Sequence, residues 1–279
     1  MKLQYLGTAA AEGWPAVFCN CESCKKARIL GGKNIRTRSQ ALINDELMLD
    51  FPCDTYLHAL RESIDLSAVR YLLITHSHSD HFYPAELVLH GGCYGHSMTS
   101  EQLHIYCNQA VKDYFYRAAA HELEKNIEST LHFHIVTPFE PFTTGGYRIT
   151  PLPAKHMQTE QALFYLIEKD GRSLLYAHDT GRFYPQVFDY LQKTGIQLDV
   201  VSLDCTSGQL ENGEDGGHMS VPDDIVVKQQ LLARGIASAK TRFIMNHFSH
   251  NGGLLHDTLC AQGQKNGMEA AYDGMCVEV

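Results

Sequence analysis

The sequence predicts a layered α/β sandwich, with sheets in the interior and helices on the outside. Two observations support this fold class. Strand-like apolar runs recur along the whole chain, and in each half a series of strands gives way to alternating strands and helices. Composition agrees, because 44% of the 279 residues are hydrophobic and 20% are charged, as in a globular protein with a sizeable core. No linker, repeat or low-complexity segment interrupts the chain, so we expect one domain over residues 1–279.

The strands are predicted from short apolar runs that polar residues or glycine-containing turns separate. We expect them at residues 3–6, 41–44, 47–51, 71–75, 104–107, 133–136, 147–152, 163–168, 173–177, 200–203 and 243–246, with a last strand before Val279. Helical spacing of apolar residues predicts helices near 55–61, 110–128, 184–193, 223–234 and 254–264. This order fits sheets covered by helices, but periodicity does not single out one fold.

The net charge and the composition of the chain disfavour two classes of partner, nucleic acids and membranes. The net charge of −9 disfavours nucleic acid, because proteins that bind it usually present a basic surface. The one basic run, from Lys25 to Arg38, is interpreted as a solvated loop, with a phosphate site as the alternative. No signal peptide or bilayer-spanning apolar run is present, and the odd number of mostly scattered cysteines fits reduced thiols. We therefore expect a cytoplasmic protein without a membrane partner. Its oligomeric state stays open, with a homodimer as one option.

Four candidate metal ligands lie within six residues, directly after the predicted strand at 71–75. They are His76, His78, Asp80 and His81. Imidazole nitrogen and carboxylate oxygen together suit zinc, manganese or iron. A loop that leaves a strand can direct several side chains to one point, which a strand or helix with this spacing could not do. The run therefore indicates a metal site rather than a chance group of surface histidines.

Three further candidates share one position, the carboxyl end of a predicted strand. They are His156, Asp179 and His247. Each alone would be interpreted as a plain loop residue. Together with the run that begins at His76, they supply enough ligands for two metal sites.

At this point the sequence resembles the metallo-β-lactamase superfamily over essentially its whole length. The resemblance implies a four-layer αββα sandwich and two catalytic divalent metal ions. The matching ligands are His76, His78 and His156 for one ion, and Asp80, His81 and His247 for the other. Asp179 matches the carboxylate that bridges both ions. True β-lactamases commonly have a cysteine there, and flavodiiron oxidoreductases have a glutamate in place of His78, so neither branch fits.

Asp50 stands where the family places a buried carboxylate that orients a ligand histidine. The alternative interpretation is an aspartate that initiates a turn, which is common at strand ends. The choice between the two interpretations requires the position of the side chain.

Three cysteines are close enough in sequence to share one ion: Cys19, Cys21 and Cys24. A strained disulfide is the alternative, but a reducing compartment disfavours it. The cyclic-phosphate phosphodiesterases of bacterial phosphonate breakdown show the same Cys-x-Cys-x-x-Cys opening, and also a histidine three residues past the last catalytic histidine. Here that residue is His250. The resemblance therefore implies one structural zinc ion held by these four side chains.

His218 lies in Gly217-His218-Met219-Ser220, before a predicted helix, where the phosphonate enzymes and tRNA-maturing endonucleases carry a histidine for the substrate phosphate. It would hold a phosphoryl oxygen or protonate the leaving alkoxide; the alternative is an ordinary loop residue. The resemblance thus implies a hydrolase for a small, cyclic or linear phosphodiester, acting through a metal-bridging hydroxide. The expected catalytic residues are Asp80, Asp179 and His218, and zinc is the expected ion, with manganese and iron as alternatives.

Two other functions stay open. The same ligands would serve hydrolysis of a carboxyl ester, thioester or lactone. A non-catalytic sensor is the third option, which a complete ligand set disfavours.

Residues 90–96, His-Gly-Gly-Cys-Tyr-Gly-His, match nothing in the phosphonate enzymes, and we expect them to contribute to the substrate pocket. Four further histidines are interpreted as non-ligands: His104, His121, His132 and His134.

Overall fold

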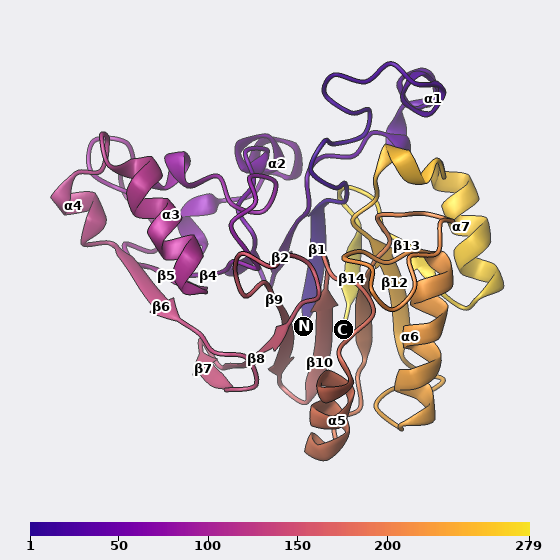
Figure 1. The fold of residues 1–279 in the computed structure, drawn as a ribbon. Helices are drawn as coiled ribbons and strands as arrows, with labels where there is room; N and C mark the ends of the chain where they lie inside the picture. The colour runs from indigo at the N-terminus through magenta and orange to yellow at the C-terminus, as the bar shows by residue number, and fades with distance from the viewer.

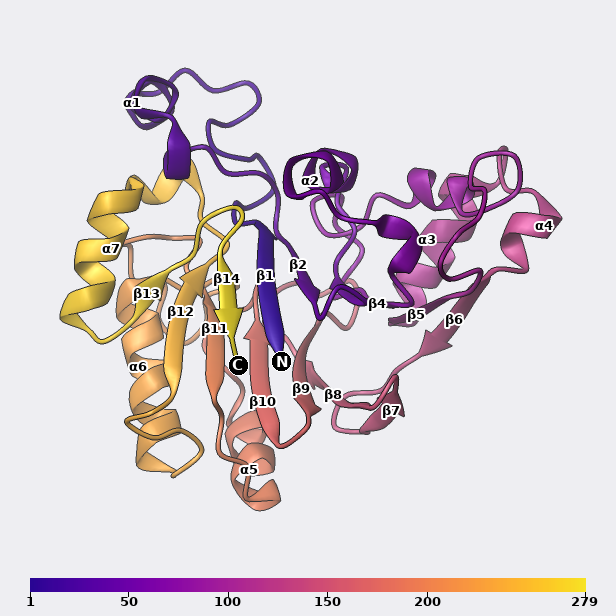
Figure 2. The same ribbon diagram turned by 180° about the vertical axis from the view of Figure 1, so that it is seen from behind.

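The computed structural model describes residues 1–279 as two seven-stranded sheets packed face to face, with helices on their outer faces (Figures 1 and 2). In order across the first sheet, the strands are β14 (Cys276–Glu278), β1 (Lys2–Gly7), β2 (Gln40–Ile43), β3 (Leu47–Leu49), β4 (Tyr71–Leu73), β5 (Leu103–Cys107) and β6 (Leu131–Ile135). The second sheet contains β13 (Glu269–Ala270), β12 (Arg242–Asn246), β11 (Val200–Asp204), β10 (Arg172–Ala177), β9 (Leu163–Lys169), β8 (Tyr147–Pro153) and β7 (Phe142–Thr144). The predicted four-layer αββα sandwich is confirmed.

The outer layers consist of helices that bury one face each. The α-helices are α1 (Glu22–Leu30), α2 (Thr55–Glu62), α3 (Gln109–Ala119), α4 (Lys125–Glu128), α5 (Pro185–Thr194), α6 (Val221–Ala233) and α7 (His256–Lys265). The 3₁₀ helices are η1 (Gly32–Asn34), η2 (Leu66–Ala68), η3 (Pro84–Leu89) and η4 (His250–Gly252). Helices α5, α6 and α7 share a core with the second sheet, and α3 and η3 share one with the first. A third core fills the space between the sheets.

Strand direction explains why one edge of the sandwich collects polar residues. Strands β3, β4, β5 and β6 are parallel in the first sheet, as are β10, β11, β12 and β13 in the second. Strand β8 is antiparallel to β9 and β9 to β10, so β8 runs in the same direction as β10. Parallel strands end at the same edge of a sheet, so the segments that follow β3, β4, β8, β10, β11 and β12 can meet there.

Three local predictions differ from the structure. The helix expected over 110–128 is two helices, α3 and α4, because the chain turns after Ala119 and so packs Ile127 into the same core as Phe115. The basic run is only partly a solvated loop: Lys25, Lys26 and Arg28 are exposed but lie in α1, and Arg36 is 2% exposed. Its guanidinium donates hydrogen bonds to the Thr8 hydroxyl and to a backbone carbonyl. Strands β7 and β13 were not predicted.

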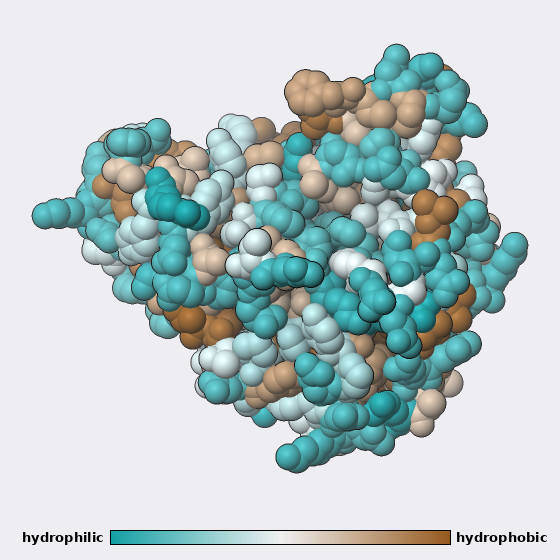
Figure 3. Space-filling model, in the orientation of Figure 1, coloured by the Kyte–Doolittle hydropathy of each residue, from teal (hydrophilic) through white to brown (hydrophobic).

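The surface is largely hydrophilic on the face that Figure 3 shows. Among the exposed apolar side chains, Val17 and Phe18 lie in the segment before α1, and apolar surface is visible at that end of the molecule (Figure 3). None of the helices combines the length and the apolar composition that crossing a membrane would require.

Candidate metal centre

The first group of ligand side chains surrounds one oxygen of Asp179. His76 and His78 come from the loop after β4, His156 from the loop after β8, and Asp179 follows β10. His76 Nε2 lies 3.2 Å and His156 Nε2 3.3 Å from Asp179 Oδ2. His78 Nδ1 is 2.9 Å from the first of these nitrogens and 3.1 Å from the second. Four ligand atoms thus converge from three loops.

A second group meets the same oxygen from the other side. His81 Nε2 lies 3.0 Å from Asp179 Oδ2, 3.2 Å from Asp80 Oδ2 and 3.2 Å from His247 Nε2. Asp80, His81, Asp179 and His247 are all buried. Because Asp179 Oδ2 belongs to both groups, the arrangement has the form of two adjacent ligand cages that share one carboxylate.

The donor set fits divalent metal ions. Ligands about 2.0–2.1 Å from a tetrahedral zinc ion lie about 3.3 Å from one another, close to the separations in both groups. The other oxygen of the shared carboxylate, Asp179 Oδ1, is buried and accepts no hydrogen bond, although His218 Nδ1 lies 2.9 Å away. Imidazoles must be neutral to bind a metal. Burial lowers the pKa of His156 to about 4, whereas at His81 and His247 the neighbouring carboxylates outweigh burial and raise the pKa.

Asp50 contacts one histidine ring of the second group. Its carboxylate is fully buried and lies 2.7 Å from His81 Nδ1, so it accepts a hydrogen bond from the ring nitrogen that faces away from the other ligands. The other oxygen accepts hydrogen bonds from the backbone N–H and the hydroxyl of Thr75. The carboxylate of Asp50 thus lies where one that orients the His81 ring would have to lie, and this role stays a prediction.

Two supporting carboxylates were not predicted. Asp204, at the end of β11, accepts hydrogen bonds from the backbone N–H groups of Asp179 and Met219, and so ties two segments of the site together. Glu160 accepts hydrogen bonds from the backbone and hydroxyl of Ser77, and so holds the loop after β4. Asp204 follows a buried strand just as Asp179 does, a signal that could have identified it. Glu160 lies in a loop with no such signal.

His218 lies next to the shared carboxylate but outside the two groups that share Asp179 Oδ2. Its Nδ1 is 2.9 Å from Asp179 Oδ1 and 3.4 Å from Asp204 Oδ2, and about a third of its side chain is exposed. Burial opposes a charged ring, but the ion pairs with the two carboxylates outweigh it and raise the pKa of His218 to about 11. The ring lines a cavity of about 410 Å³ together with His78, Asp80, His156, Asp179 and His247.

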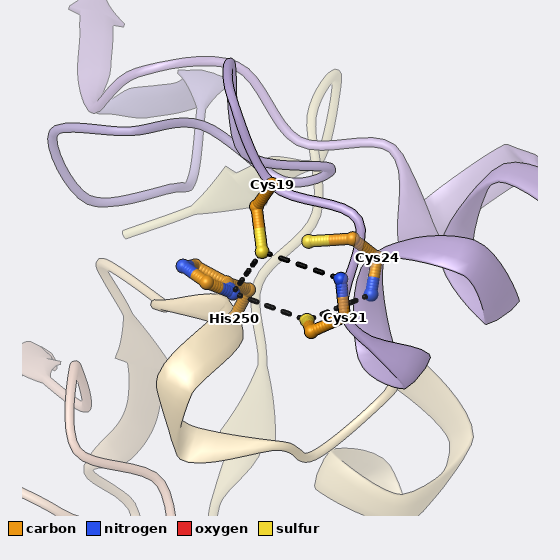
Figure 4. Close-up of side chains that lie close together, drawn as sticks. All are labelled: Cys19, Cys21, Cys24 and His250. Atoms are coloured by element: carbon orange, nitrogen blue, oxygen red, sulfur yellow. Dashed lines mark hydrogen bonds between the residues drawn. The ribbon is translucent and has the colours of Figure 1, made fainter.

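The predicted thiolate cluster forms a separate group (Figure 4). Cys19, Cys21 and Cys24 come from the start of the chain and surround His250 of η4, with His250 Nδ1 3.7 Å from the Cys19 sulfur and 3.5 Å from the Cys21 sulfur. None of these cysteines is in a disulfide. A backbone N–H at the start of α1 and the nearby imidazole lower the pKa of Cys21 to about 6. Thiolate and imidazole at these distances suit tetrahedral zinc.

Other histidines stay apart from both groups. His104 and His134 pair with each other across β5 and β6, with ring nitrogens 3.1 Å apart, and His132 stacks on His104. The expectation that residues 90–96 line the substrate pocket is not met. None of them lines the cavity that contains the metal ligands, and His90 and Gly95 instead line a second cavity. These residues follow η3 on the outer face of the first sheet.

Comparisons with known proteins agree with this architecture. A model of the β-lactamase superfamily domain matches residues 53–248, which is more than half of the chain. Coenzyme PQQ synthesis protein B of Klebsiella pneumoniae (strain 342) is 23% identical over 324 aligned positions that cover 99% of this chain and 98% of the relative. A crystal structure of a diphosphatase from the PhnP family superposes with a TM-score of 0.74 at 20% identity, covering 100% and 97% of the two chains. Zinc-bound PqqB from Methylobacterium extorquens superposes with a TM-score of 0.73 at 16% identity, covering all of both chains.

Proposed function

The chain belongs to the metallo-β-lactamase superfamily of hydrolases, and from this premise we propose that it is a dinuclear phosphodiesterase for a small, cyclic or linear phosphodiester. One observation carries the proposal: two ligand groups share Asp179 Oδ2 in a cavity that His218 also lines. We assign the first ion to the imidazoles of His76, His78 and His156. The second belongs to Asp80, His81 and His247. Zinc is the expected ion at both positions, with manganese and iron as alternatives.

The chemistry that two bound divalent cations supply at such a site is a lowered pKa for water and neutralisation of charge on phosphoryl oxygens. The protein's own side chains position the ligand groups and the substrate. Asp80 and Asp179 fix the positions of the ligand groups, and Asp50 fixes the ring of His81 through the 2.7 Å contact. His218, at the cavity wall, is placed to hold a phosphoryl oxygen or to give a proton to the departing alkoxide.

The positive charge of the cavity would come mainly from the proposed ions, because its side chains supply little of it. The residues that line it include the carboxylates of Glu12, Asp80 and Asp179, but no lysine or arginine. Two of these carboxylates are proposed metal ligands, so the two divalent ions and His218 would supply the positive charge that a phosphodiester anion meets. The same feature also suits a neutral ester, thioester or lactone, which is our second candidate class.

We also propose that Cys19, Cys21, Cys24 and His250 hold one structural zinc ion. Glu12 supports this site from the other side of the ring, because its carboxylate lies 3.5 Å from His250 Nε2 and accepts a hydrogen bond from Ser249. Since His247 is three residues from His250, this ion would hold the loop that carries a catalytic ligand.

The test compares three substrate types on protein reconstituted with zinc, manganese or iron(II): a bis-aryl phosphate, an alkyl cyclic phosphate and a lactone. Hydrolysis of the phosphodiesters is the expected result. Efficient lactone hydrolysis without phosphodiesterase activity would overturn the proposal in favour of the second class. The motifs of the site resemble those of phosphodiesterases, whereas the curated relatives are named for coenzyme PQQ synthesis, so this comparison of substrates is the deciding experiment.

Replacement of His218 distinguishes the two roles proposed for it, which are binding a phosphoryl oxygen and protonating the leaving group. If His218 protonates the leaving group, His218→Ala should keep both ions and slow the alkyl substrate by about 10²–10⁴-fold, the usual contribution of a general acid. Aryl phosphates should slow much less, because their leaving groups need little protonation. Equal slowing of both substrates would make His218 a binding residue. His121→Ala is the matched control, since His121 is exposed and lies outside the cavity.

A further inference from the structure

A second cavity, of about 460 Å³, lies on the outer face of the first sheet and shares no lining residue with the cavity of the metal centre. Met48, Leu72 and Leu103 of the strands contribute to its wall, and Tyr56 of α2 and Leu87 of η3 enclose it. Ten of its fourteen lining residues are hydrophobic. This size and lining are typical of sites for small apolar ligands.

The cavity exists because no α-helix covers this part of the sheet. Between α2 and α3 the outer layer consists of the short 3₁₀ helices η2 and η3 and of the irregular segment that follows η3. Hydrogen bonds anchor that segment at both ends: His90 Nδ1 lies 2.8 Å from the Thr130 hydroxyl, and the Ser100 N–H donates to the Ser67 carbonyl. Hydrogen bonds that link the lining residues His90 and Ser67 to residues outside the lining therefore hold this wall in place.

Glu86 is the one acidic or basic residue of the lining apart from His90. It makes no hydrogen bond or ion pair, and burial raises the pKa of its carboxyl group. Burial lowers the pKa of His90, whose ring is already engaged with Thr130, so this imidazole contributes no positive charge. The lining of the apolar cavity thus includes one carboxyl group without a partner in the protein, and a partly buried charge is costly unless something pairs with it.

We propose that this cavity binds a small amphiphilic cation, whose apolar body fills the space along the sheet and whose ammonium-type group pairs with Glu86. An anionic amphiphile would meet an uncompensated like charge. A neutral one would bury its apolar body but leave the carboxylate unpaired. This site is independent of the phosphodiesterase proposal, because the two cavities have different linings.

Calorimetric titration of the metal-loaded protein with octylamine, octanol and octanoate tests the proposal with one chain length and three head groups. Octylamine should bind most tightly and octanoate most weakly. Glu86→Gln keeps the shape of the side chain and should weaken octylamine binding about tenfold or more, the effect of losing one charge-assisted contact. It should not weaken octanol binding, because octanol does not pair with the carboxylate. Glu122→Gln, at an exposed position outside the cavity, should bind as the parent does.

A second variant locates the site. Leu89 lines the cavity but is 46% exposed, so Leu89→Trp should obstruct the entrance without disturbing the core, and should weaken both octylamine and octanol. Absence of octylamine binding to the parent protein would overturn the proposal, and so would equal affinity for all three probes. Octylamine binding that neither Glu86→Gln nor Leu89→Trp alters would place the ligand elsewhere and equally refute it.

Discussion

Three residues at the metal centre have left-handed backbone conformations, which non-glycine residues seldom adopt. They are Asp50 (φ 63°), Asp179 (φ 54°) and His247 (φ 60°), and each closely follows a buried strand. Aspartate and histidine tolerate this region better than most residues, but it still costs on the order of 1–3 kcal/mol each. Such conformations persist where surrounding contacts determine them, as the hydrogen bonds to Asp50 and to the Asp179 backbone do here.

Replacement of the shared carboxylate should empty both catalytic positions. Asp179 Oδ2 is the one ligand atom common to the two groups, so Asp179→Ala should reduce the catalytic metal content from two ions towards none and abolish activity. Metal analysis by mass spectrometry checks this, with Asp45→Ala as a control at an exposed position. Retention of two catalytic ions in Asp179→Ala would contradict the assignment.

Asp50 acts through His81, and its replacement should be milder. Asp50→Asn keeps an oxygen for the Thr75 N–H but removes the charge that faces His81 Nδ1. Loss of such a supporting carboxylate typically weakens metal binding about 10–100-fold. Titration against a competing chelator measures the change. An unaltered affinity in a correctly folded variant would assign Asp50 to the turn alone.

At the scale of elements, the first turn of α6 contains a carboxyl group without partners. Asp224 is fully buried, and neither of its side-chain oxygens accepts a hydrogen bond. Burial raises its pKa well above the usual value, and the charges of Asp204 and Asp223 add to the effect. The folded protein therefore holds this proton more tightly than the unfolded chain does, where the pKa is about 3.9.

The sign of the resulting pH dependence follows from linkage. As the pH rises above about 4, the unfolded chain releases the proton first, so Asp224 lowers stability increasingly until the pH passes its folded pKa. Asp224→Asn removes this loss and should raise the free energy of unfolding more at pH 8 than at pH 5. Urea unfolding at the two pH values measures it. Asp257→Asn, in the exposed first turn of α7, is the matched control. A gain that does not grow with pH would refute this account of Asp224.

At the scale of the whole molecule, the thiolate cluster joins two ends of the chain. Cys21 and His250 are 229 residues apart in sequence, yet their side chains lie 3.5 Å apart. If zinc binds there, its binding energy contributes directly to folding, because the unfolded chain has no preformed site. The cluster would then stabilise the N-terminal segment and the loop after β12 together.

Cys21→Ser should therefore lose one zinc ion per chain and lower the melting temperature by several degrees. Cys276→Ser, at an exposed cysteine of β14, should change neither quantity. Zinc content and thermal unfolding by circular dichroism check the two variants side by side. An unchanged zinc content in Cys21→Ser would remove the structural site from the proposal.

The sequence alone determined the fold class and the identities of the candidate ligands. Both depend on short-range signals: apolar runs with the period of a strand or helix, and polar side chains just after buried strands, as at His76 and His247. The tertiary structure decided what those signals leave open, including the shared oxygen of Asp179, the support from Asp204 and the burial of Arg36. It also shows that residues 90–96 lie away from the candidate metal centre and that two of them line a separate cavity. The physical reason is that convergence and burial depend on pairing and packing between strands far apart in the chain, which no local pattern specifies.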